Sequence, residues 1–248
     1  MKETKNLEYL YGIHPVTESL ISGKRNIKSI IVAKNLSRDI NNIRNLSSGK
    51  GLPLEFVEKQ CLRKILGHDE HQGICASVSG YPYATIDEIL EAWAISDRRA
   101  FFLILDSIED SHNLGAIART ALLCGVHGMF IPEHRSAKIT PAASKASSGA
   151  VEHLKIAVVS SLNSLIGELK KHSIIIAGLA EDGDTELSKL DWKSDIAIII
   201  GSEAKGISIT RERACDYLVR IPALKKSFSF NASIAAGIAM YEVMRQRM

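Results

Sequence analysis

The chain has 248 residues, of which 46% are hydrophobic and 24% are charged. These proportions are ordinary for a globular protein with a buried core, and the length allows one large domain or two modest ones. With a net charge of only +3, overall charge gives little reason to expect a strongly acidic partner.

The excess positive charge lies at the front of the chain. Residues 1–80 contain 12 Lys and Arg against 8 Asp and Glu, while the remainder contains 19 against 20. Four cysteines stand far apart, without a C-x-x-C pair, and this favours reduced thiols over a disulfide framework or a zinc site. The first residues lack the features of a signal or transit peptide, and no apolar run has membrane-spanning length, so we expect a cytoplasmic protein.

Residues 1–80 are predicted to form a small α/β domain, because short apolar stretches alternate between helical and strand periodicity. The expected elements are a helix at 15–21, a strand at 27–33, a helix at 39–46, a strand at 54–57, a helix at 60–66 and a strand at 74–78. Gly80 and Pro82 indicate a linker, which an amphipathic helix follows. Residues 81–98 therefore connect this domain to the next.

Residues 99–248 are predicted to form a second α/β domain. Its near-continuous Ile, Val and Leu strands, separated by helices, are typical of a parallel sheet covered on both faces. The expected strands lie at 101–105, 128–131, 155–159, 174–178, 196–200 and 217–221, and the helices at 113–124, 141–147, 162–171 and 232–247.

Two polar groups in the front domain allow more than one interpretation. His68 and His71 with the two carboxylates between them have metal-ligand residue types, but they lie in a turn without a third ligand nearby, so we expect no metal. The basic cluster at residues 24–28 could contact phosphates or could be a solvated loop.

Three polar loops follow strands of the second domain, where open α/β sheets bind ligands. In the first, Ser111 or Asn113 could cap a helix, and Arg119 could reach the same helix end one turn later. The second loop is bounded by Gly201 and Gly206, and the carboxylate of Glu203 within it could hold ribose hydroxyls or an ammonium group. A capped turn and a tight turn are the ordinary alternatives.

The third loop, at residues 221–233, precedes the last helix. Ser229, Asn231 and Ser233 could crowd polar groups around the helix N-terminus, where a negative group is favoured, or they could simply cap the helix. None of the three loops has the G-x-G-x-x-G fingerprint of a dinucleotide site or the Gly-Lys-Ser/Thr of a phosphate loop.

Taken together, the three loops resemble the signature motifs of the SpoU (TrmH-type) family of RNA ribose 2′-O-methyltransferases, in the SPOUT superfamily. The residues that carry the resemblance are, motif by motif, Asn113, Gly115 and Arg119; Gly201, Glu203 and Gly206; and Ile221, Pro222, Ser229, Asn231 and Ser233. The segments at residues 11–16 and 71–74 are similar to the ribosomal-protein-like substrate-binding domain of 23S rRNA guanosine 2′-O-methyltransferases of the RlmB type. The resemblance covers nearly the whole chain.

The resemblance implies a fold, a cofactor and a reaction. The fold is an α/β knot with a deep trefoil knot and a parallel sheet, and the reaction is methylation of a ribose 2′-hydroxyl in RNA by S-adenosylmethionine, most closely of a guanosine in 23S rRNA. A homodimer is also implied. The implied catalytic residues are Asn113, Arg119, Glu203, Ser229 and Asn231, and the implied cofactor contacts are Leu179, Gly201, Ile221 and Phe230.

The chain departs from the third motif of the family at Ala223, Lys225 and Phe230. Lys225 replaces a residue free to adopt positive φ, so we expect a different path for the cofactor loop there. Three other functions fit parts of the pattern. One is a tRNA ribose 2′-O-methyltransferase, another is a non-catalytic RNA-binding protein of ribosome assembly, and the third, from the α/β pattern alone, is a dinucleotide-dependent dehydrogenase.

Overall fold

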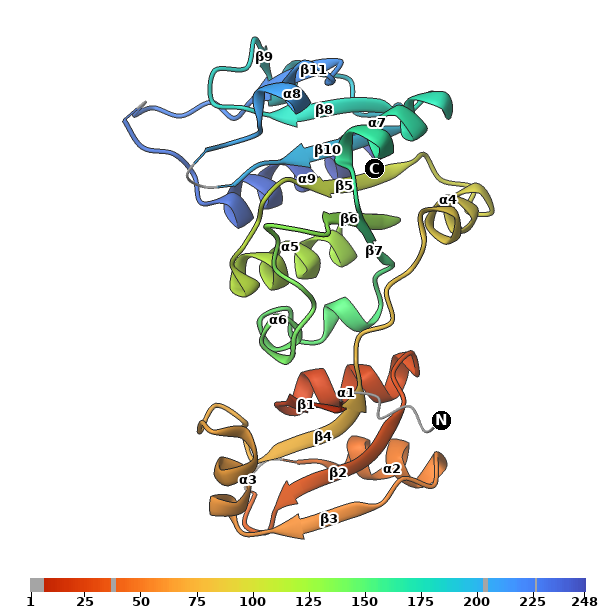
Figure 1. The fold of residues 1–248 in the computed structure, drawn as a ribbon, viewed down its shortest axis with the longest axis vertical. Helices are drawn as coiled ribbons and strands as arrows, with labels where there is room; N and C mark the ends of the chain where they lie inside the picture. The colour runs from red at the N-terminus through yellow and green to blue at the C-terminus, as the bar shows by residue number, and fades with distance from the viewer. Residues whose placement is uncertain (1–6, 37–38, 203–204, 226) are drawn as a thin grey trace. The chain divides into compact units, whose positions relative to one another are not determined.

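The computed structural model describes residues 7–36, 39–202, 205–225 and 227–248. The chain forms two compact units (Figure 1). The front unit consists of Met1–Pro82 and Ile139–His153, and the parallel-sheet unit consists of Tyr83–Lys138 and Leu154–Met248. Within the described ranges, every helix is too short or too polar to cross a bilayer.

The front unit is built on a mixed four-stranded sheet in the order β1-β4-β2-β3. β2 pairs parallel with β3, whereas β4 pairs antiparallel with both β1 and β2. The elements are β1 (Leu7–Tyr11), α1 (Ile13–Ser22), β2 (Ile27–Ala33), α2 (Asn41–Gly49), β3 (Leu54–Val57), α3 (Lys59–Leu66), β4 (Ile74–Ser79), α6 (Pro141–Ala146) and the 3₁₀ helix η1 (Ala150–Glu152). All the helices and strands predicted in residues 1–80 are present, but β1 was not predicted.

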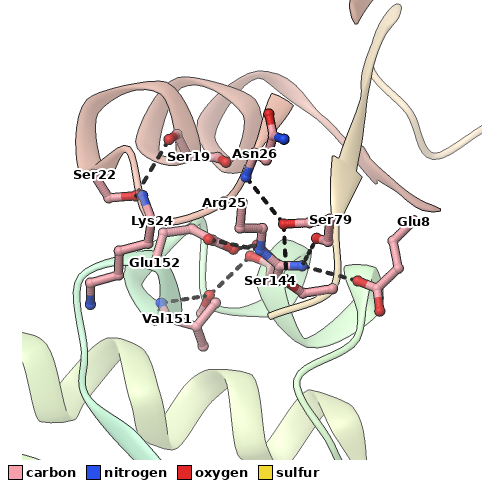
Figure 2. A network of polar contacts seen from close by, with 12 residues as sticks. Glu8, Ser19, Ser22, Lys24, Arg25, Asn26, Ser79, Ser144, Val151 and Glu152 are labelled. Carbon is pink, nitrogen blue, oxygen red and sulfur yellow. Dashed lines mark hydrogen bonds and ion pairs between the residues drawn. The ribbon is translucent and has the colours of Figure 1, made fainter. Parts of the chain in front are cut away.

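Arg25 lies in the interior of the front unit, 3% exposed, where Figure 2 shows its polar contacts. Its Nε donates to Oε2 of Glu152 at 2.9 Å, and its Nη1 donates to Oε2 of Glu8 at 3.0 Å and to the carbonyl oxygen of Ser79 at 3.2 Å. The second oxygen of Glu152 accepts from Ser144 Oγ at 3.0 Å. Arg25 and Glu152 therefore form a buried ion pair with a structural role. The sequence allowed a phosphate contact or a solvated loop here, and both interpretations were wrong for Arg25.

The same network explains why Ile139–His153 belongs to the front unit. The side chains of Arg25 and Glu152 are both 0% exposed although 127 residues separate them. His153 adds a second link, since its Nε2 lies 2.7 Å from Oε2 of Glu18 on α1. The sequence placed the helix of this segment in the second domain, whereas in the structure the segment packs against α1 and β1 of the front unit and supplies the buried partner of Arg25.

The parallel-sheet unit contains seven strands in the order β7-β6-β5-β10-β8-β11-β9, and all neighbouring strands are parallel. The predicted parallel sheet is confirmed. The elements are α4 (Ile86–Ala94), β5 (Phe101–Leu105), α5 (Ser111–Leu123), β6 (Gly128–Pro132), β7 (Ile156–Val159), α7 (Leu162–Lys171), β8 (Ile175–Leu179), β9 (Thr185–Glu186), η2 (Leu187–Lys189), β10 (Ile196–Ile200), α8 (Ile209–Glu212), β11 (Tyr217–Arg220) and α9 (Ala232–Arg247).

The sheet is buried on both faces, as its continuous apolar strands require. Phe102 and Ile104 of β5 belong to the core cluster that α4 and α7 cover. Successive side chains of a strand point to opposite faces, so Phe101 points to the other face, where the guanidinium of Arg247 on α9 lies 5.4 Å from its ring. α9 packs along α5 (Figure 1). This packing brings the N-terminus of α9 to the strand ends.

The four cysteines form no disulfide bond in the structure. Burial raises the pKa of the Cys75 thiol to about 12 and that of Cys215 to about 12. Cys215 Sγ donates to the carbonyl oxygen of Arg211. These two thiols therefore stay protonated and are inert packing groups.

Candidate functional site

A cavity of about 570 Å³ opens at the carboxyl ends of β8, β10 and β11. Leu179 ends β8, Gly201 follows β10 and Ile221 follows β11, and all three line the cavity. Ser229 and Phe230, from the loop before α9, also line it. Parallel strands end at one edge of the sheet, which is why residues so far apart in the chain meet here. All four predicted cofactor contacts therefore lie around one cavity.

The loop after β10 folds back on itself. Ser202 N donates to the carbonyl oxygen of Gly206 at 3.1 Å, and Gly206 N donates to that of Ser202 at 2.8 Å. A Cβ atom on Gly201 would overlap the backbone of Gly206 and Ile207, so this close approach requires glycine. Gly206 has a φ of 62°, which also favours glycine. Glu203, the predicted carboxylate of this loop, lies outside the described residues.

Asn231 connects the third motif to the first. Its Oδ1 accepts from the backbone N–H of Ser233 at 2.9 Å and of Ile234 at 3.4 Å, so it is the N-cap of α9. Its Nδ2 donates to Oδ1 of Asn113 at 3.1 Å. The hydrogen bond joins residues 118 positions apart and brings two predicted catalytic side chains together beside the cavity.

Helix α5 begins differently from the prediction. Its N-cap is Asp110, whose side chain accepts from the backbone N–H of His112, so the expectation that Ser111 or Asn113 caps the helix was wrong. Asn113 lies within the first turn, and its side chain is available to Asn231 instead. Arg119, two turns along α5, is exposed and does not line the cavity. The structure brings Asn113, Asn231 and Ser229 to this edge but leaves Arg119 outside the cavity.

Acidic side chains of the cavity were missed in the sequence. Glu181 and Asp182 follow β8, and Glu212 ends α8. Among the described lining residues, these three acidic side chains outnumber the basic ones, of which Lys205 is the only example. A pair of acids directly after an apolar strand is a signal that could have identified Glu181 and Asp182, because polar residues at strand ends line the crevice. The cavity therefore favours a ligand with an apolar part and positive charge.

Among the described residues, no group of three His, Cys, Asp or Glu side chains is arranged to hold a metal ion. His71 is buried in the front unit, and its Nδ1 accepts from the backbone N–H of Gly73 at 3.0 Å. The His68 ring packs edge-on against Tyr11 at 4.4 Å between centroids. Both imidazoles therefore make contacts that belong to the packing of the front unit.

Comparison with known proteins identifies two matching families. Residues 100–241 match the SpoU rRNA methylase family, and residues 9–84 match the model for RNA 2′-O ribose methyltransferase substrate binding. The chain is 35% identical over 240 residues to the putative TrmH family tRNA/rRNA methyltransferase YacO of Bacillus subtilis. The matched region covers 97% of this chain and 96% of YacO.

Two solved structures have the same fold. The SpoU methyltransferase AviRb from Streptomyces viridochromogenes, in complex with AdoMet, matches with a TM-score of 0.81 and 23% identity over 97% of this chain and 90% of that one. The AdoMet-bound rRNA methyltransferase from Sinorhizobium meliloti matches with a TM-score of 0.80 and 22% identity over 99% and 89%. These matches confirm the predicted fold class, an α/β-knot domain with a parallel sheet preceded by a small α/β domain. With its sequence matched over nearly its whole length, the chain belongs to the SpoU family of RNA methyltransferases.

Proposed function

We propose that the chain transfers a methyl group from S-adenosylmethionine to the ribose 2′-hydroxyl of a guanosine in 23S rRNA. The observation that carries the proposal is the cavity in which Leu179, Gly201, Ile221, Ser229 and Phe230 meet, which we name the donor cavity. The match of residues 9–84 to a substrate-binding model supports RNA as the acceptor. Only RNA presents the 2′-hydroxyl. An rRNA substrate also makes the cytoplasm the expected location.

The described residues of the cavity fit S-adenosylmethionine, the methyl donor of SpoU methyltransferases. The volume of about 570 Å³ lies within the ordinary range of ligand pockets. Leu179, Ile221 and Phe230 offer apolar surface for a purine, and the carboxylates of Glu181 and Asp182 complement the sulfonium and ammonium charges. When bound, the sulfonium supplies an activated methyl group.

The protein's own part in the reaction is positioning and charge stabilisation. Ser229, Asn113 and Asn231 orient the acceptor nucleotide through hydrogen bonds at the cavity edge. Arg119 stabilises the negative charge that develops on the 2′-oxygen, since a guanidinium keeps its proton and donates hydrogen bonds instead. Glu203 positions Arg119 or the ribose.

A homodimer completes this proposal. α5 and α9 carry exposed apolar side chains, among them Leu123 at 74%, Tyr241 at 57% and Ile234 at 54%. These three side chains lie on two helices that pack against each other, and contiguous exposed apolar surface marks interaction sites. A second copy packed on these two helices would cover them and bring its Arg119, on α5, to the donor cavity of the first. This arrangement accounts for an arginine that lies outside the cavity of its own chain.

The donor cavity is tested by Gly201→Ala. The added methyl group would overlap the backbone of Gly206 and Ile207, and relief of such overlap costs about 1–3 kcal/mol. We expect S-adenosylmethionine affinity, measured by calorimetry, to fall roughly tenfold or more. Gly167→Ala on α7 is the matched control, because nothing lies within 4 Å of its added Cβ. Equal affinity in the two variants would remove the loop after β10 from donor binding.

The substrate is tested in cells with and without the protein. Ribose methylation is mapped by mass spectrometry in 23S rRNA and in tRNA, and we expect one 2′-O-methylguanosine of 23S rRNA to disappear. Loss of a tRNA ribose methyl group instead would identify a tRNA methyltransferase. Unchanged methylation in both RNAs would point to an RNA-binding role without catalysis.

A further inference from the structure

A second cavity, of about 1000 Å³, lies next to the donor cavity. The two share Ser202 and residues 205–207 as a common wall. The second cavity lies over the carboxyl ends of β5, β6 and β7, and Asn113 lines it. A ribose that approaches the shared wall from this side would have its flanking phosphates within the second cavity.

Two loops form the sides of this cavity, and hydrogen bonds fix both. The backbone N–H of Ala137 donates to the carbonyl oxygen of Ile108 at 2.8 Å and so ties the loop after β6 to the loop after β5. Lys138 Nζ donates to the carbonyl oxygen of Pro132 at 2.8 Å and closes the loop after β6 on itself. The cavity therefore exists before a ligand binds, which lowers the cost of binding.

The two arginines that line the cavity differ in availability. Arg211 is already paired, because its Nε lies 3.2 Å from Oδ2 of Asp106, a carboxylate that also accepts from the backbone N–H of Ser208. Arg135 is exposed and lines the cavity, and it makes no ion pair with any residue in the described part of the chain. Its guanidinium can therefore bind a ligand without breaking an internal contact.

Arg135 also occupies an unusual backbone conformation. Its φ is 54°, in the left-handed region that glycine and asparagine adopt at much lower cost. Residues in such strained conformations cluster at ligand-binding sites. Glu109 and Asp110 line the cavity from the loop after β5 and repel anions, so a phosphate would bind on the side of Arg135.

We propose that Arg135 binds a phosphate group of the substrate RNA next to the methylated ribose, in the cavity between the loops after β5 and β6. A guanidinium forms two parallel hydrogen bonds to a phosphate, which fixes the strand as well as attracting it. This inference rests on the proposed function, because it assumes an RNA acceptor. It adds a positioning contact that belongs to none of the three sequence motifs.

The test uses Arg135→Gly in the full-length protein. Glycine adopts a φ of 54° without strain, so the loop keeps its path and the melting temperature should not fall. With a 23S rRNA transcript as probe, we expect affinity to fall about tenfold, the usual effect of losing a hydrogen bond to a charged group. The slope of log affinity against log salt should become shallower by about 0.7–0.9, the value for one lost phosphate contact.

Two further variants and one further ligand make the result specific. Lys171→Ala, which removes an exposed charge from α7, should leave affinity and slope unchanged. Arg135→Lys should restore the salt slope but only part of the affinity, because an ammonium lacks the planar fork. S-adenosylmethionine affinity should be the same in all variants. RNA affinity and slope of Arg135→Gly equal to wild type would overturn the inference, as would an equal loss of donor affinity.

RNA binding and methylation by the wild-type protein distinguish a failure of this inference from a failure of the proposed function. If wild type methylates RNA and Arg135→Gly binds it as tightly with the same salt slope, the phosphate contact alone is wrong. If wild type neither binds nor methylates any RNA, the proposed function fails and the inference fails with it.

Discussion

Arg119→Ala is expected to lose methyl transfer while it keeps its affinity for S-adenosylmethionine. Arg119 does not line the donor cavity of its own chain, and its proposed contact is with the acceptor oxygen and not with the donor, so its removal should leave donor binding intact. Removal of one preorganised group that stabilises developing charge lowers kcat by about 10²–10³. Calorimetry with the donor and transfer of a tritiated methyl group to 23S rRNA measure the two effects separately. Normal transfer by this variant would exclude Arg119 from catalysis.

A mixed dimer tests where Arg119 acts. The Arg119→Ala chain keeps its donor cavity, and the Gly201→Ala chain keeps its arginine. If the arginine serves the cavity of the second copy, equal mixing at a donor concentration too low to fill the Gly201→Ala cavity should restore roughly a quarter of wild-type activity, because half of the dimers are mixed and each has one complete site. If the arginine serves its own chain, no mixed dimer has a complete site. Activity should then stay at the level of the single variants.

Glu152→Ala is expected to destabilise the front unit by about 3–5 kcal/mol, because it leaves Arg25 buried with a lost partner. Hydrogen exchange of the β2 and β4 amides should report the loss as faster opening. Glu8→Ala is the matched control, since Glu8 contacts the same guanidinium but is 32% exposed, and it should cost only about 1 kcal/mol.

A double substitution tests the cause of this loss. Arg25→Met with Glu152→Leu removes both charges and should recover most of the stability, because well-packed apolar side chains often replace a buried ion pair without loss. Equal exchange rates in Glu152→Ala and Glu8→Ala would contradict the assignment of Glu152 as the essential partner.

The sequence predicted most accurately the strands in which every residue is buried. β5 and β10 have all five residues buried, and their predicted bounds agree with the structure. β1 was missed because only its last two residues are buried, and β9 because its two residues form a strand only by pairing with β11. The cap of α5 was misplaced because Asp110, Ser111 and Asn113 can all cap a helix.

The candidate site was predictable where it depends on strand ends and not where it depends on contacts between distant side chains. The cavity lies at the predicted edge because parallel strands end together. No local pattern could reveal the pairing of Arg25 with Glu152, since each has the neighbours of an ordinary surface charge. The catalytic roles of Asn113, Arg119, Glu203, Ser229 and Asn231 stay predictions.

The contribution of Ile139–His153 to the front unit has a consequence for biosynthesis. Domains at the amino terminus of a chain ordinarily fold first during translation. Here the first 82 residues leave the ribosome with the Arg25 guanidinium still lacking Glu152, which is translated 127 residues later. The nascent amino-terminal segment can form its four-stranded sheet, but the Arg25 guanidinium stays without Glu152 until two strands of the other sheet have been made, and truncation after residue 82 would remove this partner permanently.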